Sequence, residues 1–121
     1  MTALIFVVDD NPELGKMAEM ILESEGYRCR VFSSPQEVLS VLHEGAPFPD
    51  LLLTDYDMGP TNGLQLVENC RHTMPHLKAI LLSGTINAET VLRNSIKVNH
   101  FLPKPYQSKD LIRLVKATLK E

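Results

Sequence analysis

The sequence predicts a doubly wound α/β domain in which a five-stranded parallel sheet carries helices on both faces. Short apolar runs alternate with amphipathic segments along the whole 121-residue chain. Runs of valine, isoleucine and leucine without polar alternation are typical of strands that are buried on both faces. Repeated strand–helix–strand connections place such strands parallel to one another, with the helices on both sides of the sheet.

The first third of the chain predicts two strands and two helices. Residues 3–8 form the first apolar run, and Asn11-Pro12 opens a helix that Gly26 ends. Its apolar residues recur three or four positions apart and therefore share one face: Leu14, Met17, Ala18, Ile21 and Leu22. Residues 27–32 form the second strand. Ser34-Pro35-Gln36-Glu37 then predicts a capping box, with proline at the first position of the second helix.

The rest of the chain continues the same alternation. Three further apolar runs complete the sheet: residues 51–54, 79–82 and 101–103. A helix is expected over residues 63–73, and a shorter one that begins after Asn87 as its cap. Ser108 is expected to cap the last helix. These elements make five strand–helix units, without repeats or low-complexity segments.

The composition fits one globular domain, with 44% hydrophobic and 22% charged residues. No apolar stretch approaches the roughly 20 residues that a membrane span requires, and no basic segment typical of a secretory signal precedes the first strand. Cys29 and Cys70 are far apart and lack C-x-x-C spacing, which indicates a reducing compartment. We therefore expect a cytoplasmic protein with no membrane partner.

Positive charge is concentrated at the C-terminal end. Residues 1–86 carry twelve acids and five bases, whereas residues 87–121 carry three acids and seven bases. No aromatic interleaving or groove-reading motif accompanies these bases, so we expect a solvated face that does not bind nucleic acid directly. The 87–121 face is a candidate docking surface for a protein partner.

Four of the apolar runs end on polar residues with a shared chemistry. These residues are Asp9, Asp10, Asp55, Ser83 and Lys104. Ligands bind outside the carboxyl ends of the strands in an open parallel sheet, so the five side chains are expected at one edge. Carboxylates suit a divalent cation, and an ammonium and a hydroxyl suit a phosphoryl group. The acids would repel one another without a cation.

In order and spacing, these residues resemble the receiver domain of two-component response regulators, of the chemotaxis-regulator type. The segment D-Y-D-M-G-P-T-N-G at residues 55–63 resembles the D-x-x-M-P-G-M-(D/N)-G loop of that family. The match spans essentially the whole chain. It implies a flavodoxin-like fold with strand order 2-1-3-4-5. We expect a single receiver domain over residues 1–121 with no effector domain in this sequence, which is either a complete regulator or part of a longer protein.

The resemblance also implies a role for each site residue. Asp55 is the expected phosphoacceptor, and Lys104 and Ser83 are expected to bind the phosphoryl oxygens. The expected cofactor is Mg²⁺, with four ligands: Asp10, Asp55, the backbone carbonyl of Asp57, and Asp9 through water. Phe101, with Ser83, is the expected switch residue, and the Lys104–Pro105 peptide bond is expected to be cis.

The implied activity is signalling, and the chain is not expected to be an enzyme beyond its own phosphorylation and dephosphorylation. The expected donor is a histidine kinase or phosphotransfer protein. The expected receiver of the signal is a downstream protein or effector domain on the 87–121 face, and a homodimer is possible.

Three features depart from the family pattern. Gly59-Pro60 reverses the usual order of the loop, Asp57 places an acid at a position that tunes phosphoryl lifetime, and residues 94–100 lack the usual glycine. The expected consequences are altered rates and an irregular exit from the fourth helix.

Two alternatives remain open. Asp55-Tyr56-Asp57 also resembles the D-x-D motif of haloacid-dehalogenase-like phosphatases, with Asp55 as nucleophile. In that family, however, the acid pair comes last in the chain, and this chain has no room for a cap domain. The second alternative is a receiver-like interaction module that never accepts phosphate.

Overall fold

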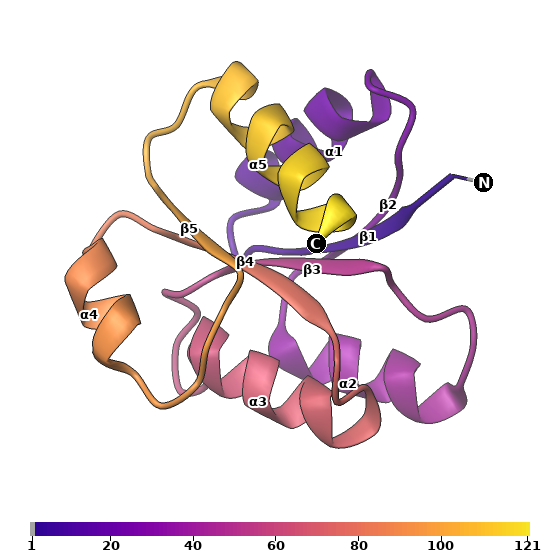
Figure 1. Ribbon diagram of the computed structural model, residues 1–121. Coiled ribbons are helices and arrows are strands. Elements are labelled where there is room, and N and C mark those ends of the chain that lie inside the picture. The colour runs from indigo at the N-terminus through magenta and orange to yellow at the C-terminus, as the bar shows by residue number, and fades with distance from the viewer. Residues whose placement is uncertain (1) are drawn as a thin grey trace.

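The computed structural model describes residues 2–121, which fold into a parallel sheet between two layers of helices (Figure 1). Within these residues the sheet has five strands in the order β2-β1-β3-β4-β5, which confirms the predicted fold class and strand order. The strands are β1 (Leu4–Val8), β2 (Arg28–Phe32), β3 (Leu51–Asp55), β4 (Lys78–Ser83) and β5 (His100–Pro103). The helices are α1 (Pro12–Glu23), α2 (Pro35–Glu44), α3 (Gly63–Thr73), α4 (Ala88–Arg93) and α5 (Ser108–Lys120).

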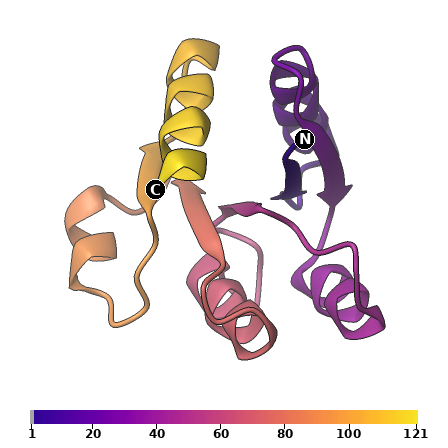
Figure 2. The ribbon, with the colours of Figure 1, turned by 45° about the vertical axis from the view of Figure 1, so that its right-hand side comes forward.

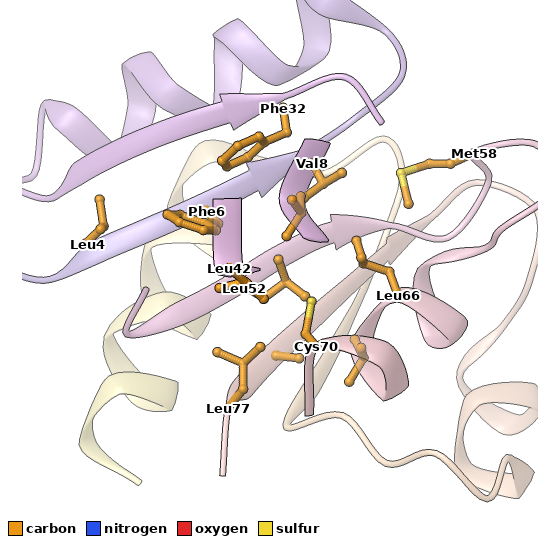
Figure 3. Close-up of a cluster of buried hydrophobic side chains, with 13 residues drawn as sticks. Leu4, Phe6, Val8, Phe32, Leu42, Leu52, Met58, Leu66, Cys70 and Leu77 are labelled. Atoms are coloured by element: carbon orange, nitrogen blue, oxygen red, sulfur yellow. The ribbon is translucent and has the colours of Figure 1, made fainter. Parts of the chain in front are cut away.

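The two faces of the sheet carry separate helix layers. Helices α1 and α5 cover one face and α2 and α3 the other, while α4 lies beside β5 (Figures 1 and 2). Successive strand residues point to opposite faces. Phe6 of β1 packs in the cluster under α2 and α3 (Figure 3), whereas Ile5 and Val7 pack against α1 and α5. Because β1 and β3 are buried along their whole length, their sequences show no polar alternation.

Two helix starts show how side chains compete for the first free amides. The Asn11 side chain accepts hydrogen bonds from the amides of Glu13 and Leu14 and so caps α1, which begins at Pro12 as predicted. Ser34 accepts from the amide of Glu37, but the Glu37 carboxylate bonds the amide and hydroxyl of Ser33. The predicted capping box is therefore only half formed.

The predicted cap of the last helix is wrong. Gln107 takes the extended backbone that precedes the first turn of α5, with φ −93° and ψ 147°, and makes no side-chain cap bond. Ser108 is thus the first residue inside the helix. In that position it does not act as the cap, because a capping residue needs non-helical torsions.

The connection from α4 to β5 is irregular, as the missing glycine predicted. Helix α4 has only six residues and ends at Arg93. The guanidinium of Arg71 in α3 donates to the carbonyls of Leu77 and Lys97, which ties this connection to the start of β4.

Cys29 and Cys70 are both free thiols. Over residues 2–121, no helix has the length and apolar character needed to cross a membrane.

Candidate functional site

Parallel pairing brings the predicted polar residues to one edge of the sheet. Val8 pairs with Thr54 across β1 and β3, so Asp9 leaves the sheet level with Asp55. Asp55 pairs with Leu82, and Ser83 pairs with Pro103, so Ser83 and Lys104 follow at the same edge. The sheet register itself therefore gathers the site.

Three carboxylates lie within reach of one cation. Asp9, Asp10 and Asp55 each offer a carboxylate oxygen, and these atoms lie within 4.8 Å of one another. Oxygen donors of this kind suit a hard divalent cation such as Mg²⁺. The donor set therefore fits the metal that the sequence implies, with Asp10 on the exposed side and the other two buried.

Both carboxylate oxygens of Asp9 already hold a protein donor. Oδ1 accepts from the amide of Asn11 at 2.9 Å, and Oδ2 accepts from the Lys104 ammonium at 2.9 Å. These bonds fix the carboxylate and use one acceptor site on each of its oxygens.

Lys104 is shared by two acids. Its Nζ lies 2.9 Å from Asp9 and 3.5 Å from Oδ2 of Asp55. Partial burial acts to lower the pKa of Lys104, but the hydrogen bond and charge of Asp9, together with the charge of Asp55, outweigh burial and raise that pKa. The ammonium therefore stays charged and compensates the acids. The Lys104–Pro105 peptide bond is cis, as predicted.

Asp55 is buried and only partly satisfied. The residue is 5% exposed, and its Oδ1 has no hydrogen-bond partner among the residues that the structure describes. Burial raises the pKa of Asp55, Lys104 opposes this effect, and Asp9 adds to it. A buried oxygen without a donor is costly. Asp55 is thus a buried carboxylate with an oxygen available for a new partner.

Ser83 does not point its proton at Asp55. Its hydroxyl donates to Oδ2 of Asp57 at 3.0 Å, and the Thr85 hydroxyl donates to Oδ1 of the same carboxylate. The sequence predicts a ligand role for the Asp57 backbone carbonyl and an effect of its acid on phosphoryl lifetime, but it predicts neither the bond from Ser83 nor a role for Thr85. The available signal was the spacing, because Asp57 and Thr85 each follow a predicted site residue by two positions.

The start of α3 lies directly against the acceptor strand. The Gly63 amide donates to the carbonyl of Tyr56 at 3.0 Å, which closes the loop of residues 55–63. A Cβ on Gly63 would overlap the carbonyl oxygen of Asp55 and come within 2.8 Å of Leu81 Cδ1. Gly59 takes φ +85° within this loop, so the reversed Gly59-Pro60 pair still meets a turn that favours glycine.

Phe101 is half-buried in a small cluster beside α4. Its neighbours include the buried Leu81 and Val91, with Tyr56 and Ile86 at the border. The amide of Ile86 donates to the Ser83 hydroxyl at 3.1 Å. A chain of direct contacts therefore links Ser83 to the cluster that holds Phe101.

A family model for the response regulator receiver domain matches residues 5–116. The chain belongs to this family. The assignment favours the receiver interpretation over the phosphatase alternative. The matched residues include the acids after β1, the acid at the end of β3 and the lysine after β5.

Curated relatives agree with the family. The chain is 28% identical over 116 residues to the transcriptional regulatory protein CpxR of Klebsiella pneumoniae, which covers 96% of this chain and 49% of the relative. It is 28% identical over 120 residues to the DNA-binding response regulator MtrA of Mycolicibacterium smegmatis. That alignment covers 99% of this chain and 52% of the relative. The chain thus spans about half the length of these relatives.

Solved structures share the fold. A CheY-like response regulator receiver domain protein from Methanospirillum hungatei superposes with a TM-score of 0.86 at 25% identity, covering 99% of this chain and 95% of the other. A receiver domain protein from Clostridium thermocellum superposes with a TM-score of 0.87 at 24% identity, covering 98% and 94%. These superpositions confirm the predicted CheY-like, flavodoxin-like architecture.

Proposed function

We propose that this receiver domain takes a phosphoryl group on Asp55, with Mg²⁺ at the adjacent acids, and so switches a protein-binding face. The main support for the proposal comes from the surroundings of the two carboxylate oxygens of Asp55. One of its oxygens is buried without a hydrogen-bond donor among residues 2–121, and the other lies 3.5 Å from Lys104. A nucleophilic carboxylate needs an available oxygen and nearby positive charge.

The proposed reaction is phosphoryl transfer from a phosphohistidine or a small acyl phosphate. An Asp55 oxygen bonds to phosphorus as the bond from phosphorus to the donor's nitrogen or oxygen breaks, and the donor leaves with that electron pair. Asp10, Asp55 and the Asp57 carbonyl would hold Mg²⁺, with Asp9 acting through water. Bound Mg²⁺ would neutralise charge between the carboxylates and the incoming phosphoryl oxygens.

Lys104 supplies positive charge from the chain itself. It is already held between Asp9 and Asp55, so little movement is required to reach an oxygen of a phosphoryl group on Asp55. Charge-assisted bonds of this kind are short and strong. Since the same ammonium favours the ionised form of Asp55, it also supports the nucleophile before transfer.

The proposed partners follow from the same reaction. A histidine kinase or phosphotransfer protein would supply the phosphoryl group, and a downstream protein or effector domain would bind the face formed by residues 87–121. The excess of bases on that face favours an acidic partner surface. The domain would act as a signalling protein and not as an enzyme with a free substrate. Steady phosphate release from simple phosphate monoesters is therefore not expected.

Intact-mass spectrometry after treatment with acetyl phosphate and Mg²⁺ tests the acceptor. The wild type should gain one phosphate, and Asp55→Asn should gain none. Asp50→Asn is the matched control, because Asp50 bonds the Leu4 amide at the opposite end of the sheet and should keep the adduct. A wild type that gains nothing would favour the non-phosphorylated interaction module, and an adduct in Asp55→Asn would place the acceptor elsewhere.

A further inference from the structure

The Asp57 carboxylate accepts hydrogen bonds from two hydroxyls, one on the last residue of β4 and one in the loop that follows it. Ser83 Oγ donates to its Oδ2 at 3.0 Å, and Thr85 Oγ1 donates to its Oδ1. We call this set of three side chains the Asp57 latch. It joins the loop after β3 to the loop after β4, at the edge of the sheet that holds Asp55.

The hydroxyl of Ser83 has no capacity left in this arrangement. A serine hydroxyl has one proton and two lone pairs. The amides of Thr85 and Ile86 donate to its oxygen at 3.0 and 3.1 Å, and its own proton is donated to Asp57. The Thr85 hydroxyl, which donates to the same carboxylate, lies 3.2 Å from the Ser83 oxygen. Ser83 is completely buried, so its hydroxyl is not reached by solvent, whereas Asp57 is half-buried. The proton reaches another acceptor only if the bond to Asp57 breaks.

A phosphoryl group on Asp55 would need that same proton. Its oxygens are strong acceptors with a charge close to −2, and Ser83 is the buried hydroxyl at the end of the neighbouring strand. Asp57 and the phosphoryl group are therefore two anionic acceptors that compete for the same hydrogen-bond donor, the Ser83 hydroxyl.

We propose that Asp57 is a positioning residue that holds the Ser83 hydroxyl away from Asp55 and so competes with the phosphoryl group for it. The inference rests on the proposed phosphorylation of Asp55. The net free energy gained when Ser83 binds the phosphoryl group is reduced by the free energy of the Ser83–Asp57 hydrogen bond, which must break first. Asp57 thereby limits the fraction of phosphorylated chains that reach the switched state.

Removing Asp57 has two effects that must be separated. Asp57→Ala frees the Ser83 hydroxyl, but it also removes a negative charge near the phosphoryl group. Only the first effect requires Ser83. A double-mutant cycle with Ser83→Ala therefore isolates the competition, since the charge effect is the same in both backgrounds.

Binding of beryllofluoride with Mg²⁺, followed by calorimetry, gives the first readout. Asp57→Ala should tighten binding when Ser83 is present by about tenfold more than it does in the Ser83→Ala background. Glu13→Ala is the charge-matched control, because Glu13 lines the surface beside Asp10 and does not contact Ser83. Its effect should be equal in both backgrounds. Equal tightening by Asp57→Ala in both backgrounds would overturn the competition.

Urea unfolding in EDTA gives a second readout that needs no phosphorylation. Asp57→Ala should lower the unfolding midpoint when Ser83 is present and lower it less in the Ser83→Ala background. Absence of this coupling would overturn the latch itself. A wild type that shows the coupling but binds no beryllofluoride would overturn the proposed function, and the competition with it, while leaving the latch in place.

Discussion

The Asp55 side chain carries an energetic conflict that the folded chain tolerates. Its carboxylate is almost completely buried, one oxygen lacks a donor among the described residues, and the nearby Asp9 adds repulsion. Lys104 offsets only part of this, so the pKa of Asp55 remains raised. Groups that must react are commonly held in such unfavourable surroundings. The unbonded oxygen lowers the stability of the folded chain, but it remains available to react with an electrophile.

Asp55→Asn should therefore stabilise the metal-free protein, by about 1–2 kcal/mol at pH 7. The pKa of Asp55 is higher in the folded chain than its ordinary value of 3.8, so ionisation penalises the folded state above the raised pKa. This penalty disappears as the pH falls through the raised pKa and below 3.8. Urea unfolding in EDTA between pH 3 and 8 should show an advantage for Asn that shrinks toward low pH. An advantage that is constant with pH would contradict the explanation.

Lys104→Met should destabilise the metal-free protein by about 2 kcal/mol, because it leaves Asp9 and Asp55 without compensation. The pKa of Lys104 is raised in the folded chain, so its contribution is complete below the ordinary value of 10.5 and is lost as the pH rises through the folded pKa. Urea unfolding at pH 7 measures the loss.

The matched control for this prediction is Lys116→Met. Lys116 pairs with Glu25 at 3.1 Å, but the two side chains are 52% and 33% exposed. Exposed pairs contribute at most about 1 kcal/mol. Equal losses for the two variants would show that Lys104 does not compensate buried charge.

At the scale of elements, the sequence predicted the order of strands and helices but not the start of every helix. Strands such as β1 and β3 leave a clear signal because both of their faces are buried. The first turn of a helix depends on which nearby side chain reaches a free amide. The Glu37 carboxylate accepts from the amide of Ser33, and α5 begins at Ser108 after Gln107, whose side chain makes no cap bond. These choices differ by small free energies and leave no periodic pattern in the sequence.

The contact between α3 and β3 depends on a missing side chain. The α3 residue Gly63 packs so closely that a Cβ would overlap the Asp55 carbonyl oxygen and approach Leu81. Gly63→Ala should destabilise the fold by about 2 kcal/mol or more, because the backbone of β3 must shift. It should also weaken Mg²⁺ binding, since the displaced segment carries Asp55 and Asp57.

Gly84→Ala is the control for this prediction. Its Cβ would meet Lys104 Cβ at 3.7 Å, which is ordinary van der Waals contact, and its backbone does not require glycine. Urea unfolding and calorimetric Mg²⁺ titration should show little change for Gly84→Ala. A similarly small change for Gly63→Ala would mean that the α3 end yields without moving the site.

At the scale of the whole molecule, the place of the site is determined by the sheet, whereas its hydrogen bonds depend on the loops. The candidate site was largely predictable, because strand ends of a parallel sheet must converge, and all five predicted residues lie at that edge. The hydrogen-bond partner of Ser83 was not predictable. Asp57 and Thr85 meet it through two irregular loops, whose paths follow no periodic rule. The hydrogen bonds made by these loops therefore could not be predicted from the pattern of strands and helices.

Those loops also predict how a signal would leave the site. If a phosphoryl group draws the Ser83 hydroxyl away from Asp57, we expect the amide of Ile86 to move with it, because it donates to the same oxygen. Ile86 packs in the cluster that holds Phe101 and Val91, so the movement reaches α4 and β5.

We expect the resulting shift in population to be partial. Moving an equilibrium from 1:99 to 99:1 requires about 5.5 kcal/mol of differential stabilisation, whereas one charge-assisted hydrogen bond contributes about 1.5–3 kcal/mol. The bond that Ser83 gives up to Asp57 reduces this further. NMR spectra with beryllofluoride and Mg²⁺ should therefore show averaged shifts of the Phe101 ring and of amides over residues 87–113. In Ser83→Ala these distant shifts should disappear while those around Asp55 persist. Equal distant shifts in both proteins would mean that the signal leaves the site by another route.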